Sequence, residues 1–506
     1  MSLIPLKNPN SLSYWCSWHT QNIVAKIDCM EKYPPEEAQR RVQGGDGARL
    51  ARTMLNEEWV FGENGYAHQY PEVRCDLYFL MDDGWDVDYG IHPDSHNSKF
   101  GSLMMSEERF PSTKGQTPAQ RMKIINEKLK ALGWKGLGIW IAAQRAAEDC
   151  TAPLGDIDKA YWTERILWSL EAGVTYWKVD WGVHGGNPAF RRMLTELGRE
   201  LYPALVIEHA TGMSPVNAFD HPDAALRGRY MGEEHVAANA KEVMAFSDVF
   251  RSYDVLNALC VPTTLDRVGT LLAWSGAIVN GEDECYINAV LGCSCGVMRS
   301  HYCQKEINEA GDDRGFRLQE VTAALRWQRL APPFAGGKVT YSDEVLFDNR
   351  LYRAGDSWWG CADGRELMQG APAVIARNIG VDTIRVEGAV KPYVAASLHP
   401  NGAYSVGVFP RVIDGYHHYP ESTLYCEIPE GVTTVGVFGE NCEMRLRLPE
   451  IPARVLVQSL IGDEVTDCTS RLVSGDTVVL TAEDMKTLFA TDDKTAPALL
   501  IRIEYR

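Results

Sequence analysis

Over its first two thirds, the sequence alternates short apolar runs with longer amphipathic segments, and this alternation limits the possible folds more than any other feature. The apolar runs have the length and the β-branched or aromatic content of buried strands. They include residues 77–81, 136–141, 175–179 and 204–207. Between them, residues 119–132 and 161–172 carry apolar side chains at helical spacing. Repeated strand–helix units over about 320 residues favour a parallel sheet closed into a (β/α)8 TIM barrel.

After about residue 340 the pattern changes to short alternating segments separated by Gly, Pro, Asn and Asp. Such segments occur at 338–341, 404–408, 433–437 and 498–503, and they are typical of an antiparallel β-sandwich. We place the boundary near Ala331-Pro332-Pro333, after a predicted helix that ends at Leu330. The sequence therefore predicts a (β/α)8 barrel over residues 1–335 and a C-terminal antiparallel β-sandwich over residues 336–506.

The charge and the cysteines restrict the partners and the compartment. A formal net charge of -18 would repel phosphate, so we expect neither nucleic acid nor a membrane as partner. We find no signal-peptide pattern and no apolar run of about 18 residues that could span a membrane. The 13 cysteines lack CxxC spacing, which favours reduced thiols in a cytoplasmic protein. Association into a homo-oligomer stays open.

Carboxylates follow four of the predicted strands. In a TIM barrel, residues just past the C-terminal ends of the strands face the active site. Those at such positions are Asp82 and Asp83, Asp180 with Lys178 two residues before it, Glu208, and Arg251 with Asp254. Lys178 and Asp180 point to the same side of their strand, so the lysine should lower the pKa of the carboxylate. Each pattern alone also fits a turn, a helix cap or a salt bridge, but together they predict a polar ligand site.

Glycoside hydrolysis suits this cluster, because it needs one ionised and one protonated carboxyl group on either side of a glycosidic bond. Tryptophans supply apolar faces for a sugar ring. Of the 14 tryptophans, those at or near predicted strand ends are Trp15, Trp18, Trp85, Trp140, Trp177 and Trp181. We therefore expect an oligosaccharide or glycoside as substrate, with Trp18 and Trp140 among the residues that bind it.

The sequence resembles glycoside hydrolase clan D, families 27 and 36, which contain α-galactosidases, α-N-acetylgalactosaminidases and raffinose synthases. The resemblance extends over about residues 12–260, in the family's order. The motifs that carry it are WCSW at 15–18, MDDGW at 81–85, GLGIW at 136–140, YWKVD at 176–180 and RSYD at 251–254. This implies a retaining α-galactosidase-like hydrolase that needs no metal or organic cofactor.

The resemblance also implies a role for each site residue. Asp180 is the expected nucleophile and Asp254 the expected acid/base. The expected sugar-binding residues are Asp82 and Asp83 at O4 and O6, Lys178 at O3 or O4, Glu208 at the 2-substituent, Arg251 at O2, and Trp18 as a stacking platform. The Arg-to-Asp spacing in RSYD is shorter than in many family members, which leaves Asp248 as a rival acid/base. The long insert between Trp18 and Asp82, with Gly44-Gly45-Asp46-Gly47, is expected to add a loop over the site.

Four alternatives stay open at this point. Two belong to the same superfamily: an α-N-acetylgalactosaminidase, disfavoured because Glu208 should crowd an N-acetyl group, and a raffinose-synthase-like transglycosylase. A third is a non-catalytic carbohydrate-binding protein, disfavoured because both Asp180 and its lysine are present. The fourth is a metal enzyme that uses Asp82, Asp83, Asp86 and Asp88, or Glu233, Glu234 and His235, although neither spacing matches a known metal motif.

Overall fold

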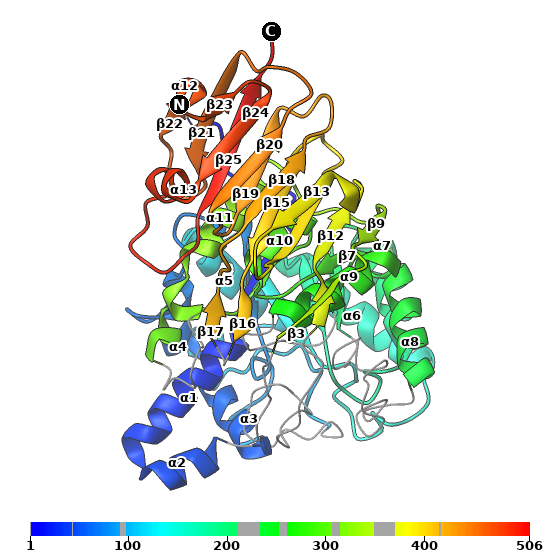
Figure 1. Cartoon of the computed structure of the whole chain (residues 1–506). Coiled ribbons are helices and arrows are strands. Elements are labelled where there is room, and N and C mark those ends of the chain that lie inside the picture. The colour runs from blue at the N-terminus through cyan, green and yellow to red at the C-terminus, as the bar shows by residue number, and fades with distance from the viewer. Residues whose placement is uncertain are drawn as a thin grey trace.

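The computed structural model describes residues 2–42, 44–91, 98–210, 233–251, 261–274, 276–305, 314–348, 370–413 and 416–506 (Figure 1). Its first half contains eight parallel strands in the order β7-β6-β5-β4-β3-β2-β1-β8. The strands are β1 (Tyr14–Cys16), β2 (Tyr78–Met81), β3 (Gly136–Ile141), β4 (Tyr176–Val179), β5 (Val206–Ala210), β6 (Val249–Arg251), β7 (Ile278–Asn280) and β8 (Gly296–Val297). A single parallel bridge from Asn280 to Ser294 joins the two ends of this sheet. The predicted (β/α)8 barrel is confirmed.

A helix follows each strand and covers the outside of the barrel. In order, they are α1 (Trp18–Lys32), α5 (Pro118–Ala131), α6 (Asp156–Ala172), α7 (Pro188–Leu201), α8 (Glu233–Phe246), α9 (Val261–Trp274), α10 (Cys285–Leu291) and α11 (Gln319–Gln328). Sequence signals start these helices: Thr117 forms a capping box before α5, and the Asn187 side chain accepts backbone N–H groups at the start of α7.

The insert between β1 and β2 is largely helical rather than a loop. Beyond α1 it contains α2 (Pro35–Arg41), α3 (Gly44–Thr53) and α4 (Glu57–Phe61). Figure 1 shows α1, α2 and α3 in blue, together at one corner of the molecule. The glycine-rich segment at 44–47 is therefore the first turn of α3.

The C-terminal half is the predicted sandwich. One sheet has the order β22-β21-β25-β19-β15-β14-β12-β9 and the other β13-β18-β20-β24-β23. The first sheet contains β9 (Val339–Tyr341), β12 (Val374–Arg377), β14 (Tyr393–Leu398), β15 (Tyr404–Phe409), β19 (Thr434–Phe438), β21 (Arg454–Ser459), β22 (Val465–Asp467) and β25 (Ala498–Glu504). The second contains β13 (Ile384–Glu387), β18 (Thr423–Glu427), β20 (Glu443–Arg447), β23 (Val473–Ser474) and β24 (Thr477–Thr481). Most neighbours are antiparallel, while β12–β14, β15–β19 and β18–β20 are parallel.

Smaller elements complete the C-terminal half. Two hairpin-like pairs are β10 (Val345–Phe347) with β11 (Gly370–Pro372), and β16 (Arg411–Ile413) with β17 (Tyr416–His418). Two short helices are α12 (Thr469–Leu472) and α13 (Ala482–Leu488). The last barrel helix ends at Gln328 and the first sandwich strand begins at Val339, and the predicted domain boundary falls within this connection.

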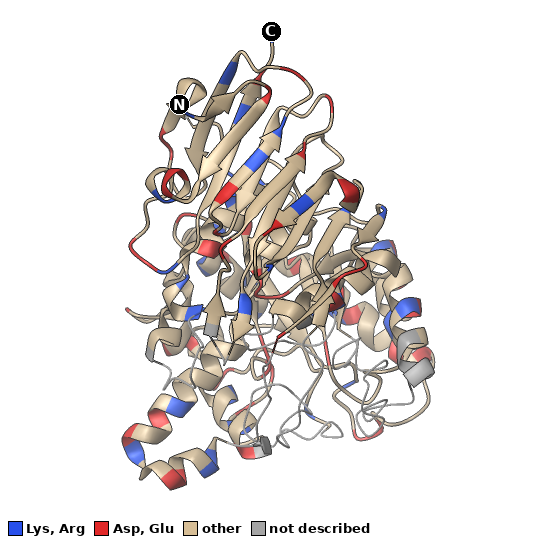
Figure 2. Cartoon of the chain, viewed as in Figure 1, with Lys and Arg blue, Asp and Glu red and all other residues tan. Residues whose placement is uncertain are grey.

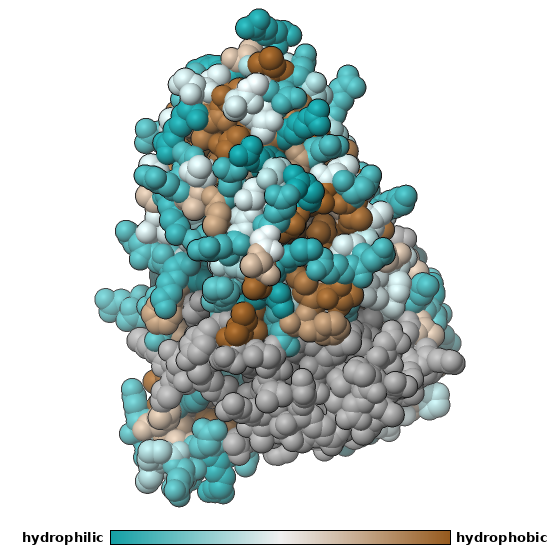
Figure 3. Space-filling view, viewed as in Figure 1, coloured by the Kyte–Doolittle hydropathy of each residue, from teal (hydrophilic) through white to brown (hydrophobic). Residues whose placement is uncertain are grey.

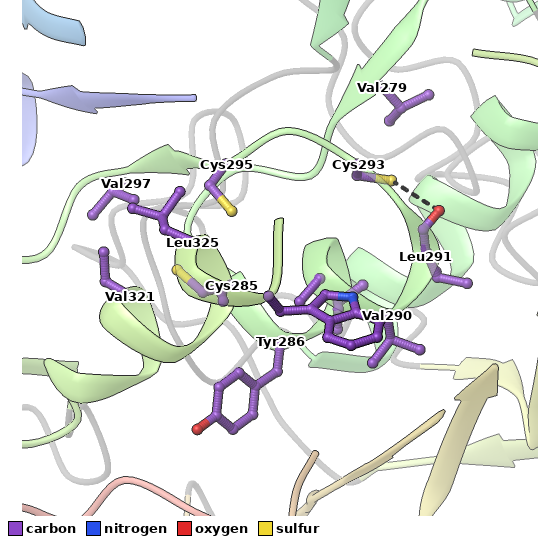
Figure 4. Close-up of a cluster of buried hydrophobic side chains, with 14 of the residues drawn as sticks. Val279, Cys285, Tyr286, Val290, Leu291, Cys293, Cys295, Val297, Val321 and Leu325 are labelled. Carbon is purple, nitrogen blue, oxygen red and sulfur yellow. Dashed lines mark hydrogen bonds between the residues drawn. The ribbon is translucent and has the colours of Figure 1, made fainter. Parts of the chain in front are cut away.

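Barrel and sandwich share one hydrophobic core, in which α10 and α11 lie between them. Figure 4 shows side chains of α10 beside those of β8 and α11 in this cluster. Trp327 of α11 packs against Gly436 of β19, where an added Cβ would come within 2.8 Å of the indole. Arg377 of β12 donates to the carbonyls of Leu291 (2.6 Å) and Phe334 (2.8 Å) and so fastens the sandwich to the end of α10.

The surface is mixed in charge and in hydropathy. Figure 2 shows Lys and Arg interspersed with Asp and Glu along the visible helices. Figure 3 shows hydrophilic residues over much of the visible sandwich, with hydrophobic patches between them. In the part of the chain that the structure describes, no helix combines the length and apolar character required to cross a bilayer.

Candidate active site

Asp180 follows the last residue of β4, and the strand's alternation decides which side chains reach the barrel interior. Trp177 points outward and donates its indole N–H to Ser169 of α6 at 3.0 Å, whereas Lys178 and Asp180 share the inner side. The backbone N–H of Asp180 donates to Ile141 O at 3.0 Å, which ties the end of β4 to β3. The predicted same-side arrangement of Lys178 and Asp180 therefore holds.

A close backbone contact fixes the turn after Asp180. Gly182 has φ +144°, and a Cβ there would lie 2.7 Å from the backbone N of Ala143. Only glycine fits such an approach without displacing the backbone. The N–H of Ala143 also donates to Trp181 O at 2.7 Å, so the residues after the carboxylate are held against the end of β3.

The two oxygens of Asp180 differ in their contacts. Oδ2 accepts the indole N–H of Trp140 at 3.1 Å and lies 3.6 Å from Arg251 NH2 and 3.8 Å from Lys178 Nζ. Among the described residues, Oδ1 has no recorded hydrogen bond or ion pair. The Asp180 side chain is 10% exposed, against 1% for Lys178 and 0% for Arg251, so it is the member of this group nearest to solvent.

Burial and nearby charges oppose each other at Asp180. Burial alone would raise its pKa, but the positive charges of Lys178 and Arg251 and the hydrogen bond from Trp140 outweigh burial and hold the pKa below its usual value. Asp180 is therefore a carboxylate at neutral pH, with Oδ2 engaged and with no contact of Oδ1 among the described residues.

Lys178 bridges Asp180 to the Asp-Asp-Gly-Trp segment after β2. Its Nζ lies 2.6 Å from Asp82 Oδ2, which also accepts the thiol of Cys16 at 3.1 Å. Asp82 Oδ1 accepts the backbone N–H of Asp83 at 2.8 Å. Burial lowers the pKa of Lys178, but the nearby carboxylates reverse this and raise it above its usual value. The lysine therefore stays charged although it is buried.

Asp83 forms an ion pair with the insert rather than with the barrel. Arg52 of α3 donates Nε to Asp83 Oδ1 at 2.7 Å and NH2 to Asp83 Oδ2, a two-point contact between buried side chains. Burial raises the pKa of Asp83, and Arg52 partly compensates. Both oxygens are engaged, so the predicted contact of Asp83 with O6 of a sugar would require the carboxylate to share its lone pairs with Arg52.

Glu208 lies deeper in the barrel than the sequence suggested. Its side chain is fully buried, and its oxygens accept the hydroxyls of Tyr14 (3.0 Å) and Tyr176 (2.9 Å) and the amide of Asn280 (2.7 Å). Arg251 Nε lies 3.2 Å from Glu208 Oε1. Protein groups engage both oxygens of this carboxylate, and its expected contact with a sugar 2-substituent stays a prediction. Its contact with Arg251 holds that arginine beside the end of β4.

The two candidates for the acid/base, Asp254 and Asp248, differ in what the structure shows of them. Asp254 lies outside the described residues, so its role remains a sequence prediction. Asp248 directly precedes β6, at the opposite end of the strand from Arg251. Its carboxylate bonds to Arg199 at 2.9 Å and to the backbone N–H of Ile207 at 3.0 Å. Asp248 therefore lies on the N-terminal face of the barrel, away from Asp180, and cannot act on the same substrate.

Only two of the six tryptophans near strand ends are partly exposed, namely Trp18 and Trp181. Trp18 packs beside the side chains that fill the barrel, where it could stack on a sugar as predicted. Trp140 is buried and donates its indole N–H to Asp180, and its expected contact with a sugar stays a prediction. Fully buried residues of this set are Trp15, Trp85 and Trp177.

The residues of the metal alternative bind different protein groups. Within the described residues, no cluster of three or more His, Cys, Asp or Glu side chains is placed to hold a metal ion. Besides the partners given above, Asp86 Oδ2 accepts the N–H of Leu103 at 3.2 Å and Asp88 Oδ1 accepts the hydroxyl of Ser106 at 2.7 Å. The side chains of Glu233, Glu234 and His235 lie outside the described residues.

Sequence reasoning missed three members of the site: Cys16, Arg52 and Arg191. Cys16 could have been found, because it shares the inner side of β1 with Tyr14. Arg191 is the fourth residue of α7, near a helix N-terminus where a cation is unfavourable, which is a weak signal of another role. Nothing in the sequence connects Arg52 with Asp83, because α3 reaches the barrel only through tertiary packing.

Comparison with known proteins found only solved structures, all of low sequence identity. No family model matches the chain, and no curated protein matches it. One similar solved structure is a Bacteroides fragilis protein provisionally assigned as an alpha-galactosidase/melibiase, with 11% identity and a TM-score of 0.39 over 97% of this chain and 78% of that chain. A Saccharomyces cerevisiae alpha-galactosidase with raffinose has 9% identity and a TM-score of 0.38 over 98% of both chains. The catalytic domain of a Talaromyces cellulolyticus xylanase has 8% identity and a TM-score of 0.36 over 99% and 98%.

Proposed function

We propose that this chain is a retaining exo-α-glycosidase of the α-galactosidase type, which hydrolyses a terminal α-linked galactose-type sugar. One observation carries the proposal: Asp180 is an ionised carboxylate at the end of a barrel strand, with Oδ2 held by Trp140 and flanked by two cations, and with no partner of Oδ1 among the described residues. The choice of a galactose-type sugar comes from the sequence motifs alone.

In the proposed mechanism, Asp180 Oδ1 attacks the anomeric carbon while Asp254 protonates the leaving oxygen. The bond to the aglycone breaks and a β-linked glycosyl ester forms. Asp254 then removes a proton from water, which attacks the anomeric carbon and releases Asp180 as a carboxylate. Two inversions restore the α-configuration. In the second step, Lys178 and Arg251 stabilise the negative charge that returns to the leaving carboxylate.

The two same-class alternatives are less well separated than the sequence suggested. The argument against an N-acetyl group relied on Glu208, which the structure places in the barrel interior. The test therefore has to include substrates with both kinds of 2-substituent, and product analysis with an added sugar acceptor to detect transglycosylation.

The first experiment is a panel of p-nitrophenyl α- and β-glycosides of galactose, N-acetylgalactosamine, glucose and mannose. We expect turnover of the α-galactoside, unaffected by a chelator, and α-galactose as the first product anomer in NMR spectra. Asp180→Asn should lower kcat by at least about 1,000-fold. Asp248→Asn is the matched control and should keep the wild-type rate. Full activity of Asp180→Asn, or turnover of β-glycosides alone, would refute the proposal.

Azide separates the two catalytic roles. With Asp180→Gly, azide replaces the nucleophile and attacks the substrate directly, which should give the β-glycosyl azide. With Asp254→Gly, azide attacks the glycosyl ester, which should give the α-glycosyl azide. The reverse pattern would exchange the roles assigned to these two aspartates.

A further inference from the structure

Arg191 of α7 binds the strand ends that carry the nucleophile. It is fully buried, and its guanidinium donates to the carbonyls of Val179 (3.0 Å), Asp180 (2.9 Å) and Ala210 (2.6 Å). Its Nε donates to Gly185 O at 2.8 Å. One side chain therefore fastens the ends of β4 and β5 and the loop that follows Asp180.

This cation has no acidic hydrogen-bond partner among the described residues: its acceptors are four carbonyl oxygens and a histidine nitrogen. Burial lowers the pKa of Arg191 to about 10, so it remains charged at neutral pH. The charge acts through space on Asp180, and each group stabilises the ionised form of the other. A buried cation without an acidic contact is costly unless a nearby charge of opposite sign compensates, and Asp180 supplies that charge.

His209 completes a closed ring of hydrogen bonds around Arg191. The distance from Arg191 NH1 to His209 Nδ1 is 3.2 Å, and because a guanidinium only donates, Nδ1 accepts and the ring proton lies on Nε2. Nε2 then donates to Thr195 Oγ1 (2.8 Å), whose hydroxyl donates to Arg191 O (3.1 Å). Burial, together with Arg191, holds the pKa of His209 well below its usual value. The histidine is therefore a neutral acceptor that orients the guanidinium without adding charge.

We propose that Arg191, oriented by His209 and Thr195, is a positioning residue for the nucleophile: it fixes the backbone of Asp180 and helps to keep its carboxylate ionised. This inference rests on the proposed function of Asp180. It assigns a role in the reaction to a helix residue that lies behind the strand and does not touch the sugar.

The test compares three variants in the pH profile of kcat/KM for an aryl α-galactoside. Arg191→Met removes the charge and the contacts, so the acidic limb should move to higher pH and kcat should fall about 100-fold with a smaller change in KM. Arg191→Lys keeps a positive charge but loses the planar guanidinium that bonds several carbonyls at once. Therefore kcat should fall, while the acidic limb of the pH profile stays near its wild-type position. Thr195→Val loosens the ring without removing charge and should give the same pattern in a milder form.

Arg377→Met is the matched control. Arg377 is also a buried arginine that donates to backbone carbonyls, and burial lowers its pKa to about 10, but it lies at the junction with the sandwich. This variant should lower the melting temperature and leave the acidic limb unchanged.

The proposal is wrong if Arg191→Met, still folded by circular dichroism, keeps the wild-type limb, or if Arg377→Met shifts the limb equally. Full activity of Asp180→Asn would instead refute the proposed function, so the two failures are distinguishable.

Discussion

At the scale of single residues, the indole of Trp140 is the closest side-chain donor to Asp180 among the described residues. Its N–H lies 3.1 Å from Asp180 Oδ2, whereas the two cations are 3.6 and 3.8 Å away. Its position near a strand end placed Trp140 among the expected sugar-binding residues. The sequence could not predict its burial, because burial of a tryptophan there depends on neighbours from other strands. In the structure, Trp140 is one of the groups that keep Asp180 ionised, together with Lys178 and Arg251.

Trp140→Phe should shift the activity profile towards higher pH. The indole N–H stabilises the ionised carboxylate, so its loss raises the pKa of Asp180, and a smaller fraction of the enzyme is active below that pKa. A hydrogen bond to a charged group is worth about 1.5 kcal/mol or more, which corresponds to a loss of about 10-fold in kcat/KM. The measurement is kcat/KM between about pH 3 and pH 8, a range that includes the usual pKa values of carboxylic acids.

Trp134→Phe provides the comparison. Trp134 is also buried, and it lies just before β3, at the opposite end of the strand from the site. It donates its indole N–H to a neutral acceptor, Ala67 O, at 2.8 Å. Its replacement should cost stability and leave the pH profile in place. Equal shifts in both variants would show that the effect is general loosening and not the contact with Asp180.

At the scale of elements, strand alternation predicted which side chains share a face but not how deep they lie. The segment 204–207 read as a strand, which placed Glu208 beyond its end, whereas β5 continues to Ala210. Glu208 is therefore inside the barrel. Likewise, Asp248 was a rival acid/base by its distance from Arg251 in the sequence, whereas β6 begins at Val249 and leaves Asp248 at the strand's N-terminal end. Errors of one to three residues at strand ends leave the fold unchanged but move a carboxylate from the mouth to the interior or to the other face.

The insert was expected to add a loop over the site, and its segment 44–47 is rich in glycine, which disfavours helices. Tertiary packing overrides that preference. Ala51 of α3 is fully buried, and the next residue, Arg52, pairs with Asp83. The stability of α3 thus depends on the same segment that lines the active site.

The Arg52–Asp83 pair should show strong coupling in a double-mutant cycle. Arg52→Met leaves a buried, unpaired carboxylate and should lower the free energy of unfolding by about 3–5 kcal/mol. Asp83→Asn should restore much of that loss when combined with Arg52→Met, because both charges are then gone. Urea denaturation at neutral pH measures the cycle, and additive losses would show that the pair does not anchor α3.

At the scale of the whole molecule, barrel and sandwich are joined by packing rather than by a linker alone. Trp327 is fully buried, lies edge-on to Phe438 with ring centres 6.0 Å apart, and occupies the space left by Gly436. The sequence predicted both parts. It could not predict this contact, because glycine in a strand has no distinctive neighbour until the helix is placed.

Trp327→Ala should destabilise both parts together. The cavity should cost about 3–5 kcal/mol, and because the core is continuous we expect one calorimetric transition at a lower temperature. Trp168→Ala, on the partly exposed outside of α6, is the control and should have a much smaller effect. Two separate transitions in the Trp327 variant would mean that the halves fold independently.

Around the C-terminal end of β4, the charged side chains that the structure describes balance one another, although the chain as a whole is acidic. Formally, the carboxylates Asp82, Asp83, Asp180 and Glu208 face the cations Arg52, Lys178, Arg191 and Arg251. Esterification of Asp180 would remove one negative charge and leave an unbalanced positive one in a buried place. That imbalance favours return of the carboxylate. A glycosyl ester at this position should therefore be hydrolysed faster than it forms and should not accumulate.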